Sequence, residues 1–203
     1  MSECLIGGIP FLSQRLVVDS VAGITPYDVE HWSKRSCGVA CVRMILLGAA
    51  KIYECANTER ARVDSLWELI HEGLQDNAYS SRGWVHTGLQ RMLARRGVHT
   101  ECRRNLEPDS LARIIEFGHL AIASVSPGFR GGETLDNGDL VPKGGHWVVV
   151  NGVQRAATGV YLRCHHPGSC AESDWANEWI DQTRFEDSFS GNAIEVLWSE
   201  VLK

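Results

Sequence analysis

Hydrophobic residues recur at helical spacing through the first half of the chain. Ser36 is a suitable N-cap for one helix, and Gly48 is typical of a helix end. Between them, Val39, Val42 and Leu46 fall on one face. The same spacing predicts three further helices, over residues 64–74, 85–96 and 108–118.

Short apolar runs rich in β-branched residues replace this pattern in the second half. They predict strands over residues 120–125, 146–153, 161–164 and 193–198. A run of helices followed by a run of strands indicates an α+β fold with an antiparallel sheet, and argues against alternating βαβ units. No repeat or linker divides the chain, so we expect a single domain over residues 1–203.

Composition places the chain among ordinary globular proteins. Of the 203 residues, 44% are hydrophobic, and 20 Lys and Arg against 25 Asp and Glu give a net charge of −5. This balance excludes a general attraction to nucleic acid or to anionic lipid. The sequence shows no export signal and no apolar run of bilayer length, so we expect a cytoplasmic protein without a membrane partner. In that compartment its seven cysteines are expected to be thiols.

Cys37 stands at the start of the first predicted helix and is followed by Gly38. A thiol at a helix N-terminus lies at the positive end of the macrodipole, which favours the thiolate. The backbone N–H there has no partner within the helix, so it can stabilise an oxyanion. Taken alone, the position favours a buried core cysteine over a nucleophile.

Two glycines precede His146 at the start of the second predicted strand. They leave the imidazole accessible, so His146 can take a proton from a thiol across the boundary between helices and sheet. A half-buried structural histidine is the alternative. If Val153 pairs with Val160 in a hairpin, Pro167 lies opposite His146, and a residue at 165–167 is its neighbour. A residue that orients a catalytic imidazole belongs at that place.

Four segments, in order, resemble those of the C39-like cysteine peptidases. They are a Pro-Phe-x-x-Gln opening, a Cys-Gly helix, a Gly-Trp-x-His-x-Gly-Leu segment and a Gly-Gly-His strand, at residues 9–14, 32–46, 83–89 and 143–153. Residues 185–196 are similar to the family's closing strand element. The resemblance spans residues 9 to 198 and implies a papain-like α+β fold. In that fold the helical N-terminal half packs on an antiparallel sheet from the C-terminal half.

The resemblance also implies catalytic roles. Cys37 matches the nucleophile, His146 matches the general base, and Gln14 matches the side-chain donor of the oxyanion hole. His31, six residues before Cys37, is the alternative donor. The choice of Gln14 leaves residues 15–31 as an extended loop before the nucleophile helix.

One dipeptide departs from the family pattern. The family has Asp-Pro or Asn-Pro on the strand after the histidine, whereas this chain has His166 followed by proline. A neutral His166 can accept the Nδ1 proton of His146, but it lacks the charge of a carboxylate. The departure implies a Cys–His dyad, a weak peptidase, or a chemistry other than proteolysis.

Five more residues beside these motifs are candidates for binding substrate, with core packing or helix capping as the alternative: Trp32, Gly38, His86, Gly145 and Trp147.

The implied reaction is attack of the Cys37 sulfur on a carbonyl carbon. The Cys37 N–H and the Gln14 amide stabilise the oxyanion, and a thioester follows. Water then completes hydrolysis of a peptide or related amide bond, whereas an amine gives acyl or peptidyl transfer or ring closure. The substrate is expected to be a peptide or a peptide-like small molecule, and no cofactor is implied.

Two other kinds of protein stay open. The first is a zinc protein, with four potential ligands: Cys164, His165, His166 and Cys170. Adjacent strand residues point to opposite faces and the spacing matches no zinc finger, so we expect no metal site. The second is an inactive binding module, which the missing Asp-Pro motivates and the retained Cys, His and Gln oppose.

Overall fold

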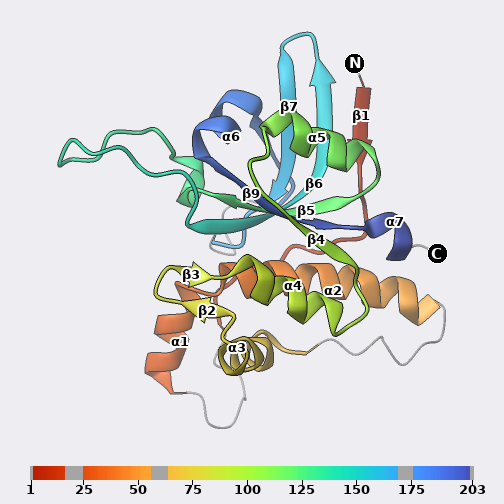
Figure 1. Cartoon of the computed structure of the whole chain (residues 1–203), viewed down its shortest axis with the longest axis vertical. Coiled ribbons are helices and arrows are strands. Elements are labelled where there is room, and N and C mark those ends of the chain that lie inside the picture. The colour runs from red at the N-terminus through yellow and green to blue at the C-terminus, as the bar shows by residue number, and fades with distance from the viewer. Residues whose placement is uncertain (1, 17–24, 56–63, 169–175, 202–203) are drawn as a thin grey trace.

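The computed structural model describes residues 2–16, 25–55, 64–168 and 176–201. They form two layers, a group of helices and an antiparallel sheet, as Figure 1 shows. This arrangement confirms the predicted α+β class. Within the described part, no helix combines the length and apolar character that a bilayer crossing requires.

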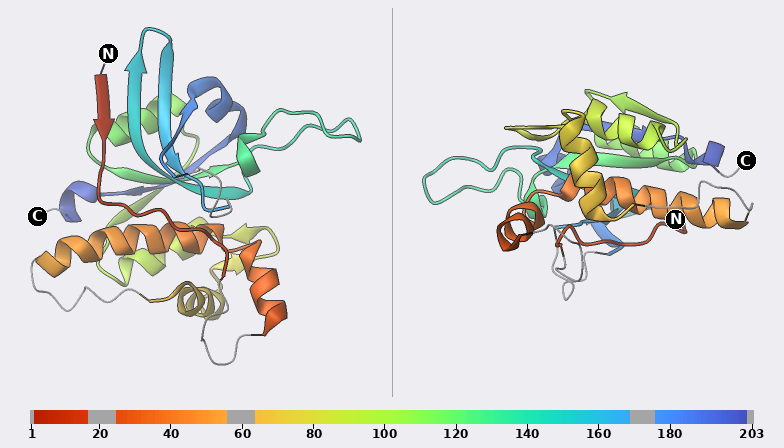
Figure 2. Two further views of the ribbon diagram at one scale, coloured as in Figure 1. Left: turned by 180° about the vertical axis from the view of Figure 1, so that it is seen from behind. Right: turned by 90° about the horizontal axis from the view of Figure 1, so that it is seen from below.

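The helical layer comes from the first half of the chain. Its elements are α1 (Pro26–Ser33), α2 (Cys37–Cys55), α3 (Leu66–Gln75), α4 (His86–Ala94) and the small hairpin of β2 (Tyr79–Ser80) and β3 (Gly83–Trp84). Seen from behind in Figure 2, α2 (orange) lies beneath the sheet.

The sheet has the strand order β4-β9-β5-β6-β7-β8, and β1 also pairs with β6. Its strands are β1 (Ser2–Leu5), β4 (Thr100–Arg103), β5 (Leu120–Val125), β6 (His146–Ala156), β7 (Gly159–His165), β8 (Glu178–Asp181) and β9 (Phe189–Val196). The further helices are α5 (Pro108–Glu116), η2 (Pro127–Phe129), α6 (Gln182–Ser188) and α7 (Trp198–Val201). Between η2 and β6, residues 130–143 project from the body of the protein as the teal excursion in Figure 1.

Helix α2 begins where the sequence predicts but runs beyond Gly48. Its predicted face is buried, with Val39 and Val42 at 0% exposure. Gly48 lies inside the helix, where the neighbouring residues come too close to leave room for a side chain. A Cβ there would meet Ile9 Cδ1 at 2.5 Å and Trp198 Cη2 at 3.1 Å. The glycine therefore serves close packing, and its prediction as a helix end is wrong.

The extended loop predicted over residues 15–31 is wrong in its last part, while residues 17–24 lie outside the described part. Helix α1 begins at Pro26, where a fixed φ suits the first helical position. Thr25 caps it: its hydroxyl accepts the Asp28 N–H at 3.2 Å, and the Asp28 carboxylate accepts the Thr25 N–H at 3.1 Å.

The hairpin of β6 and β7 is present, but its register differs from the assumed one. Val153 pairs with Leu162, because the turn is tight and Ala156 pairs with Gly159. A bulge between Val150 and Gly152 then shifts the pairing by one residue, which brings His165 opposite Val149.

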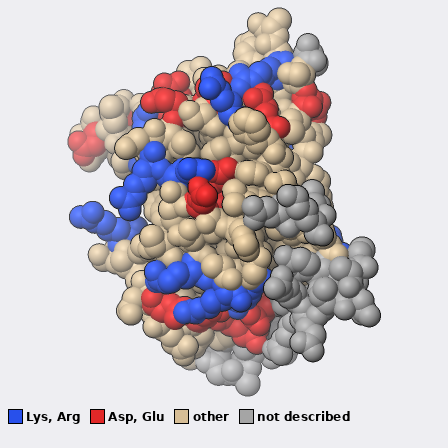
Figure 3. All heavy atoms as spheres, turned by 45° about the vertical axis from the view of Figure 1, so that its right-hand side comes forward, with Lys and Arg blue, Asp and Glu red and all other residues tan. Residues whose placement is uncertain are grey.

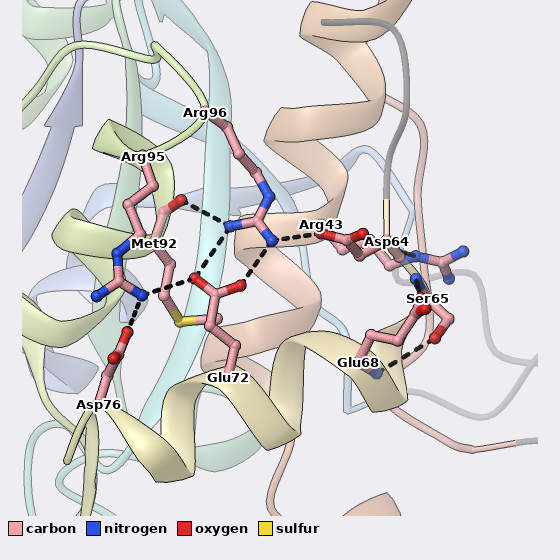
Figure 4. Close-up of polar contacts among 9 residues, drawn as sticks. All are labelled: Arg43, Asp64, Ser65, Glu68, Glu72, Asp76, Met92, Arg95 and Arg96. Atoms are coloured by element: carbon pink, nitrogen blue, oxygen red, sulfur yellow. Dashed lines mark hydrogen bonds and ion pairs between the residues drawn. The ribbon is translucent and has the colours of Figure 1, made fainter.

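Polar contacts at the end of α4 tie it to α3 (Figure 4). The Arg96 guanidinium donates to both carboxylate oxygens of Glu72, at 3.1 and 2.6 Å, and it also pairs with Asp64. Beside it, Arg95 pairs with Glu72 and Asp76. The hairpin that carries Trp84 lies between these two helices in the chain, so the cluster steadies the part of the helical layer beside the start of α2.

Candidate active site

A cleft of about 1160 Å³ brings together seven of the predicted site residues from separate parts of the chain. Its walls include Gln14 before α1, Cys37 at the start of α2, His86 at the start of α4, His146 at the start of β6 and His166 after β7. The cleft thus lies where the N-terminal ends of two helices meet the sheet.

Cys37 is the first residue of α2 and is only 7% exposed. Its sulfur accepts hydrogen bonds from the backbone N–H groups of Trp147, Gly38 and Cys37 itself. The contact with Trp147 places the sulfur beside the residue that follows His146. Burial outweighs these hydrogen bonds and raises the pKa of the Cys37 thiol to about 11, so the thiol carries its proton at neutral pH.

The residue before Cys37 joins two helices. Ser36 precedes α2 as predicted, but its hydroxyl donates to the carbonyl of Trp32 in α1. The Ser36 carbonyl accepts the N–H of Ala40 at 2.8 Å, which starts the hydrogen-bond ladder of α2. These two hydrogen bonds therefore fix the short link between α1 and α2, and they fix the position of Cys37 as well.

His146 opens β6 and is 7% exposed. Gly144 and Gly145 take φ values of +85° and +92°, which suit glycine, so they turn the chain sharply into the strand. The Nε2 atom of His146 is buried and has no hydrogen-bond partner within the described part. Burial, with a smaller contribution from His166, holds the pKa of His146 well below its usual range. The imidazole is therefore neutral and able to accept a proton.

His166 neighbours His146, as the strand argument predicts, but through its ring face. The ring centroids are 4.2 Å apart and the planes differ by 21°. Ring nitrogens bond in the plane of the ring, so this stack does not supply the orienting hydrogen bond expected from His166. The His166 Nε2 accepts the N–H of Gly128 at 3.2 Å, and burial lowers its pKa to about 4.

Gln14 lies in the cleft wall and is held from two sides. Its side-chain nitrogen donates to the carbonyl of Ser33 at 2.9 Å, and its backbone N–H donates to the carbonyl of Pro167 at 2.8 Å. One side-chain N–H remains for another acceptor. The alternative, His31, packs against the rings of Tyr27 and Trp32 and does not line the cleft. Of the two candidates, Gln14 is therefore the one that lines the cleft.

Three of the five substrate-binding candidates line the cleft: His86, Gly145 and Trp147. His86 contacts the ring of Trp147 edge-on at 4.5 Å, and its Nε2 is buried without a partner among the described residues. Burial, and then Arg104, lowers the pKa of His86, so this ring is also neutral.

The other two candidates lie behind the cleft wall. Trp32 is 8% exposed and packs edge-on against Tyr79 at 5.2 Å. Gly38 faces the helical layer, where a Cβ would lie 2.9 Å from Leu89 Cδ1 and from Trp84 Cβ. Both residues shape the helical layer, and Gly38 serves the close packing of α2.

The four potential zinc ligands lie in a segment that is only partly described, since Cys170 is outside the described residues. Among the described residues, no cluster of three or more His, Cys, Asp or Glu side chains is arranged to hold a metal. His165 bonds to the main chain: its Nδ1 accepts the N–H of Asn177 at 3.1 Å, and its Nε2 lies 3.1 Å from the carbonyl of Ile9. These contacts give it a structural role. The cysteines whose side chains are described are free: Cys4, Cys37, Cys41, Cys102 and Cys164.

Several cleft residues escape the sequence argument. Arg82 and Lys143 belong to the wall, as do Ser124, Ser190 and Asn192. They come from turns and strands far apart in the chain, and no local pattern marks them. The sequence gives one signal for them: Arg82 and Lys143 each stand next to a recognised motif.

No protein-family model and no curated protein matches the sequence. Among solved structures, a C39-like peptidase described as putative, from Bacillus anthracis, is similar over 97% of this chain and 98% of its own, at 12% identity and a TM-score of 0.62. A double-glycine-motif protease from an AMS/PCAT transporter, solved with a leader peptide, is 15% identical over 97% of this chain and 99% of its own, with a TM-score of 0.53.

The peptidase domain of Streptococcus ComA, a bifunctional ABC transporter, covers 80% of this chain and 90% of its own at 17% identity, with a TM-score of 0.50. Identities this low support a common fold and no more. The chain therefore has the papain-like α+β fold of the C39-like cysteine peptidases, as its sequence motifs predict.

Proposed function

We propose that this protein is a cysteine-dependent hydrolase that cleaves a peptide or a related amide bond through a thioester at Cys37. The observation that carries the proposal is the shared cleft, whose wall holds Cys37, His146 and Gln14. A thiol, a neutral base and an amide donor are the three groups that acyl transfer to sulfur requires. The likeness in fold to peptidases, one of them solved with a leader peptide, supports a peptide substrate.

The protonation states set the order of proton transfer. Because burial keeps Cys37 a thiol and His146 neutral, the pair rests uncharged. His146 takes the thiol proton as the sulfur bonds to the carbonyl carbon, and the Cys37 N–H and the Gln14 amide stabilise the oxyanion. The imidazolium then protonates the leaving amine as the C–N bond breaks. Water attacks the thioester, which releases the acid and restores the thiol.

Acyl transfer is the second candidate, and the burial of the working pair favours it. Cys37 and His146 are each 7% exposed, so a bound amine that fills the cleft competes well with water for the thioester. The chemistry up to the thioester is the same for both outcomes.

The test is cleavage of a mixed peptide library by the wild-type protein and by three variants, followed by mass spectrometry. Cys37→Ser and His146→Ala should each lower the rate by at least about a thousandfold, because each removes an essential group. Cys102→Ser is the matched control: this half-buried thiol bonds to Gln90 outside the cleft, so its loss should leave cleavage intact. Turnover that survives Cys37→Ser would exclude the proposal.

A further inference from the structure

Among the residues that the structure describes, the cleft wall carries basic side chains and no acidic ones. Four of the described residues that line it are cationic: Lys34, Arg35, Arg82 and Lys143. No Asp or Glu is among the described lining residues. This contrasts with the chain as a whole, whose net charge is −5.

The four cations come from both layers of the cleft wall. Lys34 and Arg35 lie in the link before Cys37, and Arg82 lies in the turn between β2 and β3. Lys143 stands three residues before His146, on the sheet side. A chain that crosses the cleft past the sulfur would therefore pass positive charge on either side.

The four cations differ in how much of their charge is available. Lys34 pairs with Glu30 at 2.8 Å, and Arg35 donates to the carbonyl of His31 at 3.2 Å. Arg82 and Lys143 are exposed and form no ion pair with any residue in the described part of the chain. These two are the ones ready to bind an incoming anion.

Several basic groups elsewhere in the described part of the chain are paired with acidic ones. Arg96 pairs with Glu72 and Asp64, and Arg155 pairs with Glu116 and Asp109. On the face in Figure 3, most patches of Lys and Arg lie against patches of Asp and Glu. The described cleft wall thus differs in sign of charge from the chain as a whole, and walls of one charge concentrate a field inside a cleft.

We infer that the cleft selects a substrate with negative charge next to the scissile bond, most directly a peptide with Glu or Asp side chains there. The inference rests on the proposed function and names its substrate class. Arg82 and Lys143 would bind the acidic groups by charge-assisted hydrogen bonds. The buried Nε2 of His86 leaves one further hydrogen-bonding atom in the wall for the substrate backbone.

The first test does not depend on turnover. Iodoacetate is anionic and iodoacetamide is neutral, and both alkylate a thiol. The ratio of their rates at Cys37, located by mass spectrometry, should exceed the ratio for N-acetylcysteine and should fall as salt is added. Arg82→Glu and Lys143→Glu should each lower it. Lys51→Glu makes the same change in net charge on an exposed site of α2 outside the cleft, so it should not.

A ratio equal to that of N-acetylcysteine, or one that Arg82→Glu and Lys143→Glu leave unchanged, overturns the inference. If the ratio behaves as expected while no peptide is cleaved, the hydrolase proposal fails and the charge selection of the cleft stands. The two proposals are therefore tested separately.

The second test compares peptides that differ at one position beside the cleaved bond, with Glu, phosphoserine, Gln or Lys. The Glu peptide should exceed the Gln peptide by about tenfold in kcat/KM, and Lys should be the poorest. Arg82→Glu should remove the preference, and Lys51→Glu should keep it. Phosphoserine above Glu would identify a phosphate as the anion that the cleft recognises. Equal rates for Glu, Gln and Lys overturn the inference.

Discussion

The imidazole of His146 stacks on that of His166, with ring centroids 4.2 Å apart and planes that differ by 21°. Both rings are buried, and burial lowers the pKa of each, so two neutral rings lie where a catalytic imidazole usually meets a carboxylate. An imidazolium at His146 would have no negative partner in this pair. Several measurable properties depend on that arrangement.

Replacement of His166 by Asp should strengthen the catalytic pair. A carboxylate beside His146 favours the charged imidazole, so the pKa of His146 should rise and the imidazolium formed in the reaction should be better stabilised. We expect kcat/KM to increase about tenfold or more. The acidic limb of the pH–rate profile should move to higher pH, which NMR titration of His146 checks directly.

The control for this change is His166→Asn, which has nearly the same shape as Asp and no charge. It should leave the pKa of His146 well below that in the Asp variant. If Asn and Asp give the same pH–rate profile, charge at position 166 does not govern His146, and this prediction is wrong.

Mild acid should destabilise the fold. The pKa of His166 is about 4 in the folded protein against 6.5 for an ordinary histidine, so the unfolded chain binds more protons between these values. The contribution to stability is complete above pH 6.5 and is lost as the pH falls toward 4. From pH 6.5 to pH 5, the free energy of unfolding should drop by about 2 kcal/mol for this residue.

Urea unfolding at several pH values measures this loss. His146 acts in the same direction, because its pKa is also lowered. In His166→Asn the slope between pH 6.5 and pH 5 should be visibly shallower than in the wild type. Identical slopes in the two proteins would mean that His166 titrates normally in the folded state.

Close packing at Gly38 should make this position intolerant of alanine. The added methyl group would lie 2.9 Å from both Leu89 Cδ1 and Trp84 Cβ, so the start of α2 or its neighbours must shift. We expect Gly38→Ala to cost about 1–3 kcal/mol in the free energy of unfolding. Gly7→Ala is the control, since nothing lies within 4 Å of a Cβ there. Equal thermal unfolding midpoints for the two variants would refute this account.

Arg96 should contribute more to stability than its neighbour Arg95. Its side chain is 21% exposed and its fork holds Glu72 and Asp64, whereas the Arg95 side chain is 50% exposed. Arg96→Ala should lower the free energy of unfolding by about 1–3 kcal/mol, because it leaves two half-buried carboxylates without this partner. Arg95→Ala should cost clearly less, because solvent screens the ion pairs of an exposed side chain. Chemical unfolding of both variants tests this ranking. A larger loss in the free energy of unfolding for Arg95→Ala than for Arg96→Ala would contradict it.

The sequence predicts the elements whose patterns are local. The strand over 120–125 matches β5, and the helices that follow Ser65 and Val85 are α3 and α4, with Ser65 in a capping box. Other features depend on distant partners. Gly48 looks like a helix end until Ile9 and Trp198 are seen to pack on it, and the bulge in β6 changes the hairpin register without a local signature.

The same limit applies to the site. Cys37, His146 and Gln14 carry recognisable motifs, and the structure brings them to one cleft. The face-on contact of His166 and the burial that sets the protonation states arise from tertiary packing. The cationic wall arises in the same way, because Arg82 and Lys143 lie 61 residues apart in the chain and meet only in the fold.

Because the walls of the cleft come from two layers, a molecule that fits it holds the helices and the sheet to each other. Such a molecule binds the folded state alone and raises the melting temperature by mass action. A simple thermal-shift screen of acidic peptides, carried out on Cys37→Ser so that nothing is consumed, would rank candidate substrates before any of them is known to react. The melting temperature thus reports binding in the cleft, independently of catalysis.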